Sequence, residues 1–147
     1  MEAMARALRG AVYLAAVAIA SPAWAEQQAP VTLGEVATRV TRPSLDLPKA
    51  LRHALEREIA TLRVPVGTSA PSYVLSASLV KLGLRTGGVS LGVQCTVSAV
   101  LREKKSGAIR AIVTGRAESD GESPEVELEV LDAAVRGAVA SVPAAIR

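Results

Sequence analysis

Residues 88–118, GVSLGVQCTVSAVLREKKSGAIRAIVTGRAE, decide the fold. Apolar side chains alternate with small polar ones over about 88–103 and again over about 108–118. This period of two is typical of antiparallel strands with one packed face and one solvated face. The glycine-containing segment 104–107 predicts a hairpin between the two strands. A further strand over about 72–83, followed by a glycine-containing turn, completes a predicted three-stranded meander.

The alternation assigns side chains to the two faces of this sheet. The packed face is predicted to hold Val89, Leu91, Val93, Cys95, Val97, Ala99 and Leu101 from the second strand, and Ile109, Ala111, Val113 and Ala117 from the third. The outward face is predicted to present small polar groups and two guanidinium groups: Gln94, Thr96, Ser98, Arg110, Thr114 and Arg116. The strand over 72–83 is ambiguous, because Val74, Val80 and Leu82 alternate out of step with Tyr73, Leu75 and Leu79.

Two amphipathic helices flank the meander. Over about 48–62, Leu51, Leu55, Ile59 and Leu62 form one apolar stripe. Over about 125–142, an aliphatic stripe follows Ser123-Pro124, a typical helix start, and Pro143 is expected to end the helix. Gly137 lies inside this second helix, where we expect it to allow close approach to the sheet.

These elements predict an α+β fold. We expect a two-layer sandwich, in which a three-stranded antiparallel meander carries both helices on one face. A short strand over 35–41 would make four strands, in the order (β)αβββα. The expected domain runs over 46–147, and residues 26–45 are expected to form a flexible lead-in that includes this short strand.

The first 25 residues predict a cleavable secretory signal. Arg6 and Arg9 precede an uncharged apolar run from Gly10 to Ala20, and Ala23-Trp24-Ala25 places small residues at a cleavage position. The apolar run is shorter than the roughly 20 residues that span a bilayer, and no later stretch is long and apolar enough. We therefore expect a periplasmic or secreted product. Its mature chain is expected to begin near Glu26 and to contain no transmembrane segment.

Composition narrows the range of functions. Residues 1–25 contain two Arg and one Glu, so the 17 basic and 14 acidic residues of the chain become 15 and 13 without them. Tyr73 is the only aromatic residue outside that segment. Nucleic-acid binders usually carry a dense basic footprint and often aromatic stacking platforms, so we expect no nucleic-acid partner. Cys95 is the single cysteine, which excludes an intramolecular disulfide.

The sequence carries no recognisable catalytic, metal or cofactor motif. His53 is the only histidine, and no G-x-S-x-G nucleophile motif accompanies it. Cys95 falls on the apolar face of a strand, where a free thiol packs as a small hydrophobe. One histidine and one cysteine do not make an ordinary zinc site. We expect no cofactor, no metal ion and no catalytic residue.

The third predicted strand and the helix after it carry a resemblance. The segment Gly107-Ala108-Ile109-Arg110-Ala111 through Gly115-Arg116-Ala117, followed by Ala133-Ala134 and Gly137-Ala138-Val139, resembles uncharacterised exported proteins of high-GC Gram-negative bacteria. The layout over about 48–142 is also similar to the α/β modules of periplasmic envelope-assembly helpers. Those helpers are often lipoproteins, whereas Glu26 rather than Cys follows the predicted signal here.

These features favour an exported, non-enzymatic module that binds a protein partner or an envelope component. The outward sheet face is the predicted binding surface. Two alternatives stay open: a small hydrolase that uses His53, and a structural protein that self-associates through a sheet edge. The oligomeric state is not predicted.

Overall fold

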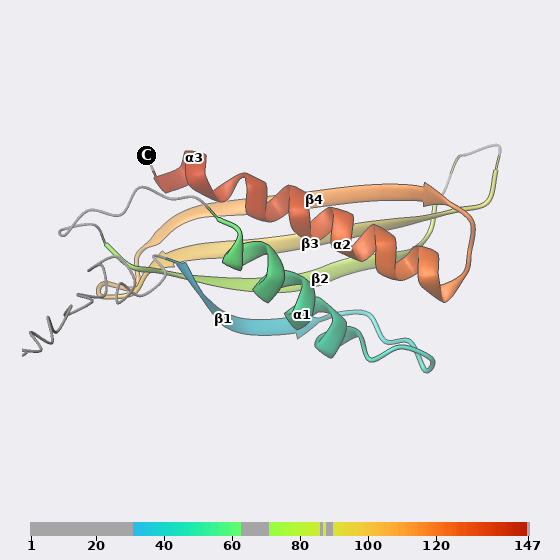
Figure 1. Cartoon of the computed structure of the whole chain (residues 1–147), viewed down its shortest axis with the longest axis horizontal. Helices are drawn as coiled ribbons and strands as arrows, with labels where there is room; N and C mark the ends of the chain where they lie inside the picture. The colour runs from blue at the N-terminus through green and yellow to red at the C-terminus, as the bar shows by residue number, and fades with distance from the viewer. Residues whose placement is uncertain (1–30, 63–70, 86, 88–89, 147) are drawn as a thin grey trace, which may run out of the picture.

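The computed structural model describes residues 31–62, 71–85, 87 and 90–146. The fold is α+β, with one mixed four-stranded sheet and two long helices in the order βαβββα (Figure 1). The predicted fold class is therefore confirmed. The elements are β1 (Val31–Thr38), α1 (Leu47–Ala60), β2 (Tyr73–Leu84), β3 (Gly92–Glu103), β4 (Ile109–Asp120), α2 (Pro124–Ala140) and the short α3 (Val142–Ile146).

The strands lie in the order β1-β2-β3-β4. The predicted meander is present, because β2 pairs with β3 and β3 with β4, both antiparallel. The fourth strand, β1, pairs with β2 in parallel, and α1 forms the crossover between them. β1 begins at Val31, four residues before the expected start at Glu35, and Val31 is a core residue with 2% exposure.

Both helices cover the same face of the sheet (Figure 1). α1 and α2 also contact each other through two ion pairs, Arg57 with Asp132 at 3.0 Å and Arg136 with Glu58 at 3.6 Å. The inward side chains of the strands and the apolar stripes of the helices form one aliphatic core, to which Tyr73 adds the only aromatic ring among the described residues. Cys95 is 1% exposed in this core, as the alternation of β3 predicted.

A β-bulge explains the ambiguous pattern of β2. The register moves from Leu79 opposite Val97 to Lys81 opposite Thr96, which leaves Val80 as the extra residue. Because one added residue reverses the alternation, Leu79 and Leu82 are both buried although they are three positions apart. The apolar side chains on either side of Val80 therefore face the same core.

Two residues predicted on the packed face are exposed instead. Ile109 is 55% exposed because a second bulge shifts the register from Leu101 opposite Ala111 to Arg102 opposite Ile109. Leu91 is 69% exposed because β3 begins only at Gly92. The expectation for both positions was wrong, since the alternation was extended past the regular part of each strand.

Capping side chains mark the N-termini of both long helices. The Ser123 hydroxyl accepts a hydrogen bond from the backbone N–H of Val126 at 3.2 Å, which confirms the predicted N-cap of α2. Asp46 caps α1 in the same way, through the N–H of Lys49 at 3.2 Å. α2 ends at Ala140, and Pro143 lies inside the short α3 that follows rather than at the end of α2.

The close approach between α2 and the sheet depends on a different glycine from the one predicted. A Cβ at Gly115 of β4 would lie 2.7 Å from the backbone nitrogen of Ala138 and would collide with the carbonyl of Ala134. A Cβ at Gly137 would meet only the Cα of Gly115, at 3.8 Å. Gly115 is therefore the residue that lets α2 lie directly on β4.

Candidate functional site

The face of the sheet opposite the helices is the candidate site. It is called the open face below, and it consists of the outward side chains of β1 to β4. The strand registers align these side chains in rows that run across the sheet. Because opposite residues of paired strands point to the same side, each row is a fixed set of neighbours about 5 Å apart.

One row of the open face carries hydroxyl groups. Ser78 of β2 lies opposite Ser98 of β3, which lies opposite Thr114 of β4. Ser76 lies in the neighbouring row of β2, and its hydroxyl accepts a hydrogen bond from the backbone N–H of Glu35 at 3.3 Å. Short hydroxyl side chains protrude little from the sheet, and they can form hydrogen bonds with a partner.

The next row carries positive charge. Lys81 of β2 lies opposite Thr96, and Thr96 lies opposite Arg116 of β4. Arg39 follows β1 beside this row, and its backbone N–H donates to the carbonyl of Leu79 at 3.0 Å. The three cationic side chains are exposed, and none forms an ion pair with another described residue. Arg39, Lys81, Thr96 and Arg116 are called the basic row below.

A shallow groove of about 470 Å³ crosses the open face over β1, β2 and β3. Its lining mixes hydroxyl, apolar and charged side chains, which are Glu35, Ala37, Arg39, Ser76, Ser78, Val80, Ser98 and Val100 together with Ala77. The groove thus joins the hydroxyl row to one end of the basic row. A second groove, of about 460 Å³, lies between the end of α1 and β1 and is mainly apolar.

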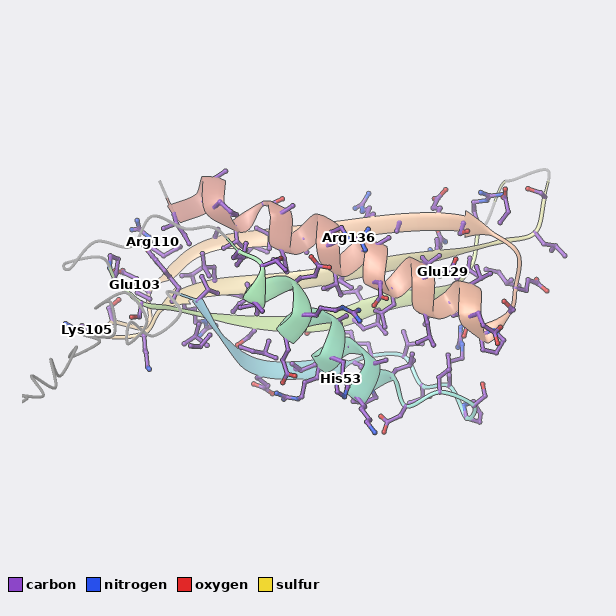
Figure 2. All side chains as sticks on the ribbon, viewed as in Figure 1. His53, Glu103, Lys105, Arg110, Glu129 and Arg136 are labelled. Carbon is purple, nitrogen blue, oxygen red and sulfur yellow. The ribbon has the colours of Figure 1, made fainter. Side chains whose placement is uncertain are left out.

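The structure brings together five of the six predicted site residues. Gln94, Thr96, Ser98, Thr114 and Arg116 occupy adjacent rows of β3 and β4 on the open face. Arg110 lies apart from them, beside the β3–β4 hairpin (Figure 2). Six residues of strand separate it from Arg116, a distance of roughly 20 Å. The two guanidinium groups are therefore too far apart to bind the same group of a partner.

Four residues of the open face were not found by sequence reasoning. Ser76, Ser78 and Lys81 lie on β2, whose facing was ambiguous because of the bulge at Val80. Arg39 enters the site because β1 pairs with β2 in parallel. The sequence contains no local signal for that pairing, which depends on the α1 crossover.

A polar cluster around Arg85 lies at one end of the open face. The guanidinium group of Arg85 lies over Gly92 and donates to the Ser90 hydroxyl at 3.0 Å and to the Asp120 carboxylate at 3.1 Å. It also lies 4.0 Å from Glu118. These contacts connect the end of β2 to the start of β3 and the end of β4.

The reactive side chains do not assemble into a catalytic site in the described part of the chain. His53 is exposed on α1 (Figure 2) and makes no hydrogen bond to another described residue. Burial raises the pKa of the Cys95 thiol to about 12, which disfavours the nucleophilic thiolate. Over the described ranges, no three His, Cys, Asp or Glu side chains come close enough to hold a metal ion.

Within the described residues, no helix combines the length and apolar character needed to cross a membrane. No protein-family model and no curated protein matches the chain. Solved structures of bacterial proteins do share its fold.

The hypothetical protein CT253 from Chlamydia trachomatis matches with a TM-score of 0.62 and 10% identity, over 79% of this chain and 96% of that chain. Protein XCC0632 from Xanthomonas campestris matches with a TM-score of 0.53 and 12% identity, over 82% and 85%. PelC from Paraburkholderia phytofirmans, a dodecamer, matches at a TM-score of 0.45 and 19% identity, over 73% and 85%. At these identities the first two likenesses show a shared fold, and the third, at its lower TM-score, adds nothing to that conclusion.

Proposed function

We propose that this chain is an exported, non-enzymatic module that binds a protein partner or an envelope component through its open face. The observation that carries the proposal is the basic row beside the hydroxyl row on a sheet face that neither helix covers. Binding, rather than catalysis, fits a surface whose polar groups are spread over four strands. Export is supported by the signal-like pattern of residues 1–25.

The chemistry of the basic row favours a partner surface that offers carboxylate groups. Lys81 and Arg116 are two strands apart, a separation of roughly 10 Å, and both lie in one row of the same sheet. Guanidinium and ammonium groups bind carboxylates through charge-assisted hydrogen bonds. The hydroxyl groups of Ser78, Ser98 and Thr114 lie one row away and supply neutral donors and acceptors. A partner with acidic and polar side chains on a ridge would fit the groove.

The proposal is tested by reversing charge on the open face. Lys81→Glu combined with Arg116→Glu replaces two cations of the basic row with carboxylates. Both side chains are exposed, so the fold is expected to remain intact. Arg52→Glu, at an exposed position of α1, is the matched control because it changes charge on the helix side of the molecule.

The assay compares the proteins captured from envelope extract by the wild type, the double variant and the control. We expect a partner that the wild type and Arg52→Glu retain and that the double variant loses. An identical set of partners for all three proteins would remove the open face from consideration. Arg110→Ala is expected to leave this capture unchanged, because Arg110 lies roughly 20 Å from Arg116.

The predicted export is tested separately. Mass spectrometry of the protein recovered from the periplasm or medium is expected to show an N-terminus at Glu26. Retention of the full-length chain in the cytoplasm would contradict the export part of the proposal and would leave the fold unaffected.

A further inference from the structure

β4 is an edge strand of the described sheet. It pairs with β3 only. The N–H of Gly121 donates to the carbonyl of Leu91 at 3.0 Å, in register with the β3–β4 ladder. Since hydrogen-bonded and non-bonded pairs alternate in an antiparallel ladder, the odd-numbered residues of β4 bond to β3. The even-numbered residues from Ile112 to Glu118 point their N–H and C=O groups away from the sheet.

No hydrogen bond between described residues occupies this outer edge from Ala111 to Glu118. The opposite edge, β1, is less suited to pairing. β1 has eight residues, and its ladder is interrupted by an irregularity between Leu33 and Val36. Bulges and short strands protect an edge from pairing with another chain. β4 keeps a regular register from Ala111 to Asp120, and its bulge at Arg110 lies outside that stretch.

The charges along β4 are arranged for self-pairing. Arg110 lies near its start and Glu118 near its end. An antiparallel pair of two β4 strands centred on Thr114 places Arg110 of each copy opposite Glu118 of the other. The same register places Ile112 opposite Arg116, whose aliphatic stem covers it. A register centred on Arg116 would instead oppose two like charges, which is destabilising.

The helix above β4 carries small residues near the edge of the sheet. The flank of α2 that faces α1 carries Asp132 and Arg136 in ion pairs. The exposed side of α2 nearer β4 carries Ala133 and Gly137, both small and spaced four residues apart, and a Cβ at Gly137 would lie 3.8 Å from Gly115 Cα of β4.

We infer that two copies of this chain form a two-fold dimer by antiparallel pairing of their β4 strands. The two sheets then become one continuous sheet, and both open faces lie on the same side of it. A two-fold axis makes every contact away from the axis occur twice, so each dimer contains two Arg110–Glu118 pairs. This inference concerns the sheet edge and does not depend on the proposed function of the open face.

The inference is tested by measuring the mass of the purified protein in solution over a dilution series, by sedimentation velocity or light scattering. The wild type is expected to show twice the chain mass and to dissociate on dilution. Thr114→Pro removes an N–H that points outward, and proline is tolerated on an edge strand for that reason. It is expected to be monomeric, whereas Thr114→Ala keeps the N–H and is expected to dimerise. A monomeric wild type throughout the series would overturn the inference, as would a folded Thr114→Pro variant that stays dimeric.

A charge exchange gives a second, independent readout. Arg110→Glu and Glu118→Arg are each expected to weaken dimerisation by about tenfold or more, because each sets two pairs of like charges opposite each other. The double variant restores opposite charges and is expected to recover the dimer. If Thr114→Pro does not fold, this exchange decides the question, and equal dimerisation of the single and double variants would refute the inferred register.

Discussion

The contact between Gly115 and α2 gives a sharp prediction about stability. A Cβ at this position would lie 2.7 Å from Ala138 N and 2.8 Å from the carbonyl carbon of Ala134, and it would collide with that carbonyl's oxygen. These atoms belong to a helical backbone, which cannot rotate aside as a side chain can. Gly115→Ala therefore requires α2 to move away from β4, even though alanine is otherwise no worse than glycine in a strand.

The magnitude follows from the cost of overpacking. Inserting a methyl group into a packed core costs about 1–3 kcal/mol, and occasionally more. Since the obstruction at Gly115 is backbone, we expect a loss of about 3 kcal/mol. Domains of ordinary stability unfold at a cost of about 5–15 kcal/mol. For a domain of this size, the loss corresponds to a fall in Tm of roughly 10 °C or more.

Gly137→Ala is the matched control, because the two glycines face each other. An added Cβ at Gly137 would be in ordinary contact, at 3.8 Å from Gly115 Cα, and alanine is favoured over glycine inside a helix by about 1 kcal/mol. The same chemical change is thus expected to stabilise the protein at one position and to destabilise it at the other. Urea unfolding followed by circular dichroism measures both. Equal unfolding midpoints for Gly115→Ala and the wild type would refute the proposed closeness of α2 and β4.

Three further predictions concern other contacts. Asp46→Ala and Ser123→Ala each remove an N-cap and are expected to lower the free energy of unfolding by about 1 kcal/mol; an unchanged urea midpoint would show that the caps are not needed. Arg42→Ala removes a hydrogen bond of 2.6 Å from the guanidinium group to the carbonyl of Leu82 and is expected to cost about 1–2 kcal/mol, measured by the same unfolding curves. Burial raises the pKa of the Cys95 thiol from 9.0 to about 12. As the pH rises, the thiol of the unfolded chain therefore loses its proton before the thiol of the folded chain does. The free energy of unfolding is expected to fall as the pH rises from 9 towards 12. Cys95→Ala is expected to have a smaller dependence on pH in that range, and native Cys95 that reacts rapidly with a thiol reagent at pH 8 would contradict its burial.

Local chemistry predicted much of the fold. The two apolar stripes, the N-cap at Ser123 and the alternation of β3 each act within a few residues, so they are readable from the chain. Cys95 and Val97 are buried as their alternation predicts. The two β-bulges were not readable, because an extra residue is recognised only against the strand opposite it. Val80 on β2 and Arg110 on β4 are extra only relative to β3.

The candidate site was predicted in part for the same reason. Thr96, Ser98, Thr114 and Arg116 lie on the regular portions of β3 and β4, so their shared face followed from alternation. The separation of Arg110 from this group did not follow, because the bulge and the strand length fix it. The cations contributed by β1 and β2 also escaped prediction, since their neighbours lie far along the chain.

The sequence alone determined the two long helices, the three strands of the meander and the side chains that avoid water along the regular part of β3, because periodicity and capping are properties of neighbouring residues. Tertiary structure decided that β1 pairs in parallel with β2, that Lys81 lies in line with Arg116, and that β4 lies at an edge of the described sheet. It also decided that Gly115, rather than Gly137, allows the backbone of α2 to lie close against the sheet. Each of these facts depends on groups distant in sequence being held at fixed distances by a common core, and no local pattern encodes such distances.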